Sequence, residues 1–180
     1  VEKTTDPNGF ETDYIYDEFG RLKEVFYEGT MIKDIDYHYT GTVGNFNSDK
    51  NYVVSTNYGA VGDENHSLSN ITYLDGLGRP IQNIAIGQSP ADGSDIVTAT
   101  SYDEFGRETK QYLPFVANSN GMFVEDAINQ QHDFYNNSTN DVSVISNPYN
   151  ETLYESSPLN RAKEQASPGS EWAIGSGHTI

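Results

Sequence analysis

The stretch Tyr16-Asp17-Glu18-Phe19-Gly20-Arg21 occurs a second time, unchanged, as Tyr102-Asp103-Glu104-Phe105-Gly106-Arg107. A looser copy reads Tyr73-Leu74-Asp75-Gly76-Leu77-Gly78-Arg79, and a more degraded one includes Tyr154 and Leu159-Asn160-Arg161. Internal repeats of this kind indicate an architecture built from one repeated unit. Each copy combines an aromatic strand end, an apolar residue and a residue that tolerates positive φ, and the three clearer copies also have an acidic turn opener. We therefore expect a row of β-hairpin corners.

Turn chemistry assigns a role to each position of the corner. The Asp can accept hydrogen bonds from the turn amides, as in Asx turns, and the Gly or Asn can take the left-handed conformation. We expect the apolar residue to plug the corner so that successive corners stack, and the Arg to pair with an acidic residue of the neighbouring unit. These positions are Asp17, Phe19, Gly20 and Arg21, then Asp75, Leu77, Gly78 and Arg79, then Asp103, Phe105, Gly106 and Arg107, and finally Leu159, Asn160 and Arg161.

Alternating side chains predict strands on both sides of the corners. Residues 31–39 alternate most clearly and form, with 14–16 and 21–27, a predicted three-stranded meander. Turn formers in residues 40–49 interrupt the pattern, so we expect a unit over 1–44 and a second region over 45–180 with corners at 75–79, 103–107 and 156–161. Further strands are predicted at 51–58, 70–74, 80–86, 96–102 and 107–113, with weak ones near 142–146 and 151–155.

A helix is predicted over residues 124–136, where apolar side chains recur at helical spacing. Pro80 is expected at an edge or at the first position of a strand, because it cannot donate a ladder hydrogen bond. Trp172 is expected to cap a sheet end. The fold class is thus all-β, an array of antiparallel β-hairpins in a spiral sheet or shell segment with one short helix.

The amino-acid composition excludes several kinds of binding partner and functional site. The 180 residues carry a formal net charge of −17, which repels phosphate backbones and argues against nucleic acid. The alternative explanation of this charge is that an acidic surface keeps the protein soluble. The absence of cysteine excludes disulfides, zinc-thiolate sites and thiol nucleophiles. No stretch approaches the ~20 apolar residues of a membrane-spanning helix.

The sequence offers little catalytic chemistry. Its four histidines, His38, His66, His132 and His178, lack metal-ligand spacing. Carboxylates in Asp34-Ile35-Asp36 and Asp92-Gly93-Ser94-Asp95 could contribute oxygens to Ca²⁺, but neither segment matches a calcium loop, and solvated loop carboxylates are the better interpretation. We find no nucleophile elbow and no phosphate-binding Gly loop. We therefore expect no enzyme activity and no cofactor.

The Tyr-Asp-x-x-Gly-Arg core within hairpins resembles the YD-repeat, or RHS-repeat, family, and residues 9–39 look like one complete unit. The remainder is similar to a companion region of such repeats in proteins of Bacteroidetes bacteria. The phrases that carry this likeness are 72–82, 102–107 with 112–114, 155–161, 166–169 and 175–180. The resemblance implies a long sheet of hairpins that spirals into a hollow shell around a variable C-terminal domain, often a toxin.

The resemblance also implies an exported protein at the cell surface or outside the cell. Its partners would be neighbouring repeats, a C-terminal cargo domain of the same chain, and possible secretion or outer-membrane machinery. The leading hypothesis is a structural scaffold segment cut from a much larger chain. The tyrosine-rich sheets leave open an extracellular glycan-binding or adhesion module, and a hydrolase is a distant third alternative.

Overall fold

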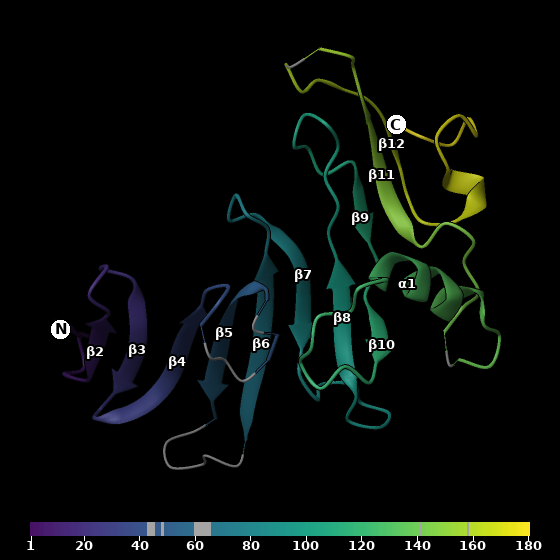
Figure 1. The fold of residues 1–180 in the computed structure, drawn as a ribbon. Coiled ribbons are helices and arrows are strands. Elements are labelled where there is room, and N and C mark those ends of the chain that lie inside the picture. The colour runs from purple at the N-terminus through teal and green to yellow at the C-terminus, as the bar shows by residue number, and fades with distance from the viewer. Residues whose placement is uncertain (43–45, 48, 60–65, 141, 158) are drawn as a thin grey trace.

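The computed structural model describes residues 1–180 except 43–45, 48, 60–65, 141 and 158. Figure 1 shows a long row of strands that begins at the N-terminus and ends in a smaller group of strands beside one helix. The first part contains β1 (Glu2–Thr5), β2 (Glu11–Tyr16), β3 (Leu22–Tyr27), β4 (Thr30–His38), β5 (Asn51–Tyr58), β6 (Ser67–Leu74), β7 (Pro80–Ala85) and β8 (Asp95–Ala99). The second part contains β9 (Lys110–Tyr112), β10 (Phe115–Ala117), α1 (Ala127–Asn136), β11 (Tyr149–Tyr154), β12 (Ala162–Ala166) and the 3₁₀ turn η1 (Ser170–Trp172).

The strands form two antiparallel sheets. Within the described residues, nine strands form one sheet in the order β1-β2-β3-β4-β5-β6-β7-β8-β10, and three form a second in the order β12-β11-β9. Neighbouring strands of the large sheet are consecutive in sequence as far as β8, as expected for hairpins joined end to end. The predicted all-β fold, an antiparallel array with one short helix, is confirmed. Pro80 is the first residue of β7, as its missing amide hydrogen predicted.

The third predicted hairpin is wrong in its strand pairing. The main chains of residues 96–102 and 107–113 pair only at an isolated bridge, Thr100 to Gln111. Strand β9 pairs instead with β11 in the small sheet, while β10 pairs with β8. Pro114 separates β9 from β10, and because proline has no amide hydrogen the ladder cannot continue through it. The chain therefore moves from one sheet to the other at this point.

The start of the helix and one weak strand also differ from the sequence prediction. The helix begins at Ala127 rather than at residue 124, because both main-chain polar groups of Val124 bond to the side chain of Gln82. Residues 142–146 form no strand, and the amide of Ile145 donates to Tyr135 at the end of α1. The strand predicted at 151–155 is present as β11.

The hydrophobic core lies under the centre of the large sheet. It is formed by side chains of β5–β8, by Phe115 of β10 and by Ala127 and Tyr135 of α1. Tyr52, Ile71, Tyr73, Ile84 and Val97 are at most 1% exposed. In contrast, the only residue of β1–β3 in the buried class is Val25, and every residue of β1 is exposed. The first strands thus extend the sheet beyond the core that stabilises it.

The predicted unit boundary at residues 44 and 45 lies outside the described residues. On its two sides the sheet is continuous, since β4 and β5 pair from Lys33–Asn57 to His38–Tyr52. Among the described residues no helix is both long and apolar enough to cross a membrane.

Candidate functional site

The corner at residues 17–21 is closed by one carboxylate. Asp17 Oδ1 accepts hydrogen bonds from the amides of Phe19 and Arg21, both at 2.9 Å, and Oδ2 accepts one from Arg21 Nε at 2.7 Å. In the main chain, the Asp17 amide donates to the Arg21 carbonyl at 2.9 Å, and the Gly20 amide donates to the Asp17 carbonyl at 3.0 Å. A single Asp side chain therefore fixes both the turn and the orientation of the Arg.

The second and third corners repeat this geometry. Asp75 Oδ2 accepts from Arg79 Nε at 2.7 Å, and Asp103 Oδ2 accepts from Arg107 Nε at 2.8 Å. The turn amides bond to Oδ1 of each Asp at 2.8–2.9 Å. The predicted positive φ is confirmed at all four corners, with 76° at Gly20, 77° at Gly78, 75° at Gly106 and 56° at Asn160.

The prediction that each corner Arg pairs with an acidic residue of the neighbouring unit is wrong. The five-residue turn places the Asp and the Arg on the two sides of the same hairpin, so the ion pair forms within the corner. The guanidinium faces are then left to contact the next part of the chain. Arg21 lies 4.1 Å from the ring centre of Tyr37, Arg79 lies 4.3 Å from that of Tyr102, and Arg107 lies 4.8 Å from that of Tyr154.

Two of these tyrosines add a hydrogen bond back to the preceding corner. The Tyr37 hydroxyl donates to the carbonyl of Leu22 at 3.0 Å, and the Tyr102 hydroxyl donates to that of Pro80 at 2.8 Å. Leu22 and Pro80 each directly follow the stacked Arg in the sequence. The same Arg–Tyr link thus recurs between successive parts of the sheet, and we call the series of linked corners the corner ladder.

The corners of the ladder lie along one edge of the molecule. Strands β2, β6 and β8 run in the same direction because neighbouring strands are antiparallel, so the corners that follow them share an edge (Figure 1). The second and third corners are close together, since a Cβ on Gly106 would lie 3.0 Å from Arg79 Nη1. The third reaches the fourth through Arg107 Nη1, which donates to the carbonyl of Glu155 at 3.3 Å.

The fourth corner has an opener that the sequence interpretation missed. Glu155 takes the place of the Asp, accepting hydrogen bonds from Arg161 Nε at 2.8 Å and from the Ser157 hydroxyl at 2.6 Å. Its amide donates to the Arg161 carbonyl at 3.0 Å. The Glu–Arg spacing is two residues longer than the Asp–Arg spacing, which concealed the match. The acidic residue directly after Tyr154 was the available signal.

The predicted apolar plugs are wrong. Phe19 is 72% exposed, Leu77 79%, Phe105 51% and Leu159 67%. In the first three corners the amide of this residue bonds to the Asp carboxylate at the centre of the turn, which leaves the side chain on the outside. The ladder therefore presents a row of exposed apolar side chains along its edge.

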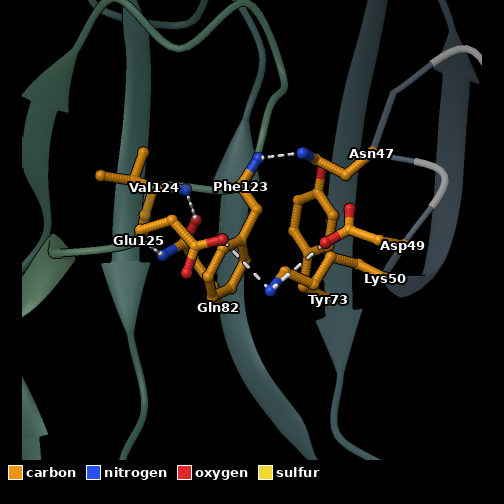
Figure 2. Close-up of polar contacts among 8 residues, drawn as sticks. All are labelled: Asn47, Asp49, Lys50, Tyr73, Gln82, Phe123, Val124 and Glu125. Carbon is orange, nitrogen blue, oxygen red and sulfur yellow. Dashed lines mark hydrogen bonds and ion pairs between the residues drawn. The ribbon is translucent and has the colours of Figure 1, made fainter.

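Away from the ladder, buried polar side chains tie two loop segments to the core, as Figure 2 shows. Asn47 Oδ1 accepts a hydrogen bond from the amide of Phe123 at 2.7 Å. The Tyr73 hydroxyl lies 3.2 Å from Asn47 Oδ1 and donates to the Gly121 carbonyl at 2.7 Å. Burial raises the pKa of Tyr73, so this hydroxyl remains a donor. Gln82 bonds to both main-chain groups of Val124, at 2.8 and 3.0 Å.

Of the carboxylates weighed as calcium ligands, Asp95 has a structural role. Asp95 is 4% exposed, and its oxygens accept from the amide of Gly87 at 2.8 Å, the amide of Gly121 at 2.8 Å and the hydroxyl of Ser119 at 2.5 Å. It therefore joins β8 to two loops. Among the described residues, no group of three or more His, Asp and Glu side chains is arranged to hold a metal ion.

The requirement for positive φ at the glycine of a corner can be tested within the second corner, which contains two glycines. Gly78 has a φ of 77° and Gly76 does not have positive φ, while a Cβ at either position would meet nothing within 4 Å. Replacing Gly78 by Ala should lower the free energy of unfolding by about 1–2 kcal/mol because of left-handed strain. Gly76→Ala, the matched control, should change it little. Equal effects in urea denaturation would refute the strain explanation.

The corner carboxylates should titrate below their ordinary range. The amide and guanidinium of Arg79 and the amide of Leu77 lower the pKa of Asp75 despite partial desolvation. A depressed folded-state pKa contributes stability that is present above the unfolded pKa and is lost as the pH falls through the folded pKa. We therefore expect the Asp75 carboxyl carbon to titrate below pH 3.8 in a ¹³C NMR experiment. A value at or above 3.8 would contradict the observed closure of the corner.

The part of the chain that carries the second, third and fourth corners matches a protein-family model, over residues 49–180. The match begins just before β5 and includes α1 and the small sheet, whereas β1–β4 lie outside it. No curated protein matches the chain. Because the match covers most of the 180 residues, the chain belongs to the family described as Domain of unknown function (DUF6443).

Proposed function

We propose that this chain is a structural segment of the shell of a large exported RHS-type repeat protein. The observation that carries the proposal is the corner ladder, in which one Asp–Arg turn and one Arg–Tyr contact recur along one edge of the molecule. Identical chemistry at repeated positions suits a scaffold, because stability in such arrays comes from each unit and its nearest neighbours. The resemblance of the repeated phrase to YD repeats supports the same conclusion.

The open edge of the large sheet supports this proposal. Strand β1 is the outermost strand, pairs with β2 on one side and is exposed at every residue. An exposed edge strand presents unpaired amides and carbonyls that readily pair with another strand. In a longer shell, a neighbouring repeat would pair with β1 and would also cover the weakly buried strands β2 and β3.

The row of exposed apolar side chains on the corner ladder also supports the shell proposal. Phe19, Leu77, Phe105 and Leu159 are spread along one edge and are mostly exposed. Covering an exposed apolar side chain with another part of a protein removes it from water, which is favourable. In this proposal the row contacts other parts of the same shell or the C-terminal domain that the shell would enclose. The shell would lie at the cell surface or outside the cell, and this chain would be a structural part of it rather than an enzyme.

Hydrogen exchange measured in two contexts tests the proposal. In the isolated 180-residue chain, residues 1–40 should be much less protected than residues 70–113, because the core lies under β5–β8. In the parent protein, protection of β1–β3 should rise at least about tenfold while that of β6–β8 changes little, so β6–β8 serve as the internal control. A monomeric isolated chain with uniform protection, unchanged in the parent, would identify a self-contained domain and overturn the shell proposal.

A further inference from the structure

A polar groove lies over the small sheet, on the part of the molecule farthest from β1. It has a volume of about 420 Å³ and lies between strands β9, β11 and β12 and the C-terminal residues 172–180. The side chains that matter for its chemistry are Gln111, Asn150, Thr152, Gln165, Trp172 and His178. Its volume falls within the range of about 300–1,000 Å³ that is usual for small-molecule sites.

The C-terminal wall of the groove is held in place by hydrogen bonds to β12. Glu164 Oε1 accepts from the amide of Gly175 at 2.8 Å and from the hydroxyl of Thr179. Ile180 and Gln165 exchange main-chain hydrogen bonds at 2.8 and 3.2 Å. A wall that is already ordered lowers the entropic cost of binding a ligand.

Trp172 is the only tryptophan of the chain, and the sequence suggested that it caps a sheet end. Its side chain is 49% exposed and lines the groove, with the His178 ring tilted beside it at a centroid distance of 5.4 Å. His178 Nδ1 lies 2.8 Å from the carbonyl of Glu171 and donates to it, which fixes the ring next to the indole. An indole presents a large apolar surface and one N–H donor, a combination suited to ligands with both apolar and polar faces.

The remaining lining is rich in neutral hydrogen-bonding groups. Gln111, Asn150, Thr152 and Gln165 each have an amide or hydroxyl side chain with no hydrogen-bond partner among the described residues. Amides and hydroxyls can both donate and accept, so they match the hydroxyl groups of a sugar, which do the same. No lysine or arginine lines the groove, whereas Glu151 does.

This charge pattern distinguishes between classes of ligand. With a carboxylate in the groove and a formal net charge of −17 on the chain, phosphates, sulfates and uronic acids are repelled. A peptide added as a strand to β12 would need main-chain groups that Ile180 already occupies at Gln165. Neutral polyhydroxylated ligands satisfy both constraints. We propose that the groove beside Trp172 is a binding site for neutral carbohydrate.

The single tryptophan makes binding directly measurable in the unmodified chain. We would titrate the protein with maltohexaose, cellohexaose, chitohexaose and, as an acidic probe, hexagalacturonate. At least one neutral probe should shift the Trp172 emission saturably and reduce its quenching by acrylamide at least about twofold, while hexagalacturonate does neither. Failure of these probes and of a wider array of neutral glycans to bind would overturn the proposal, as would equal binding of the acidic probe.

Binding affinities of variants, measured by calorimetry, then show whether the ligand binds in this groove. Trp172→Ala should weaken binding of the neutral probe at least about tenfold. Tyr39→Ala is the matched control, because Tyr39 is 50% exposed and lies outside the groove, and it should bind like the unmodified chain. If Trp172→Ala fails to fold by circular dichroism, the double variant Gln111→Ala with Gln165→Ala decides the question. Binding that persists in a folded groove variant would contradict the proposal.

Discussion

The Asp–Arg pair that closes each of the first three corners is the interaction on which the arrangement of the hairpins depends. In the corner at residues 75–79, one carboxylate accepts two turn amides and the guanidinium, so the Arg projects in a single direction. That direction brings its face over Tyr102, at the start of the next corner. Exposed ion pairs contribute about 0–1 kcal/mol and exposed cation–π contacts about 0.5–1 kcal/mol. No single link is strong, but repetition of the same link fixes how successive hairpins lie.

The corner ladder and the hydrophobic core act at different places. The core is concentrated under β5–β8 and α1, where tyrosine rings and aliphatic side chains are almost fully buried. Buried polar groups such as Gln82 and Asp95 then tie the covering loops to the strands. Strands β1–β3 have little of this packing. They are stabilised mainly by main-chain hydrogen bonds between strands and by the contact of the Arg21 guanidinium with the Tyr37 ring. This uneven distribution is why the N-terminal end suits pairing with a neighbour.

Local rules accounted for the features that depend on one turn or one strand. The four positive φ values, the hairpins around Gly20 and Gly78, Pro80 at the start of β7 and the body of the helix follow from short stretches of sequence. Features set by distant contacts could not be found in this way. The division of the third hairpin depends on Pro114 and on the pairing of β9 with β11, and the late helix start depends on Gln82. The tyrosine that each of Arg21, Arg79 and Arg107 contacts likewise lies in a separate segment of the chain.

The central claim is that the corner arginines link successive parts of the sheet, and a double-mutant cycle between Arg79 and Tyr102 tests it most directly. Free energies of unfolding of Arg79→Gln, Tyr102→Leu and the double variant should give a coupling energy of about 0.5–1 kcal/mol. Tyr154 contacts Arg107 rather than Arg79, so Arg79→Gln with Tyr154→Leu should be additive within about 0.3–0.5 kcal/mol. Additive effects in the Arg79–Tyr102 cycle would contradict the account and would leave the corners as independent turns.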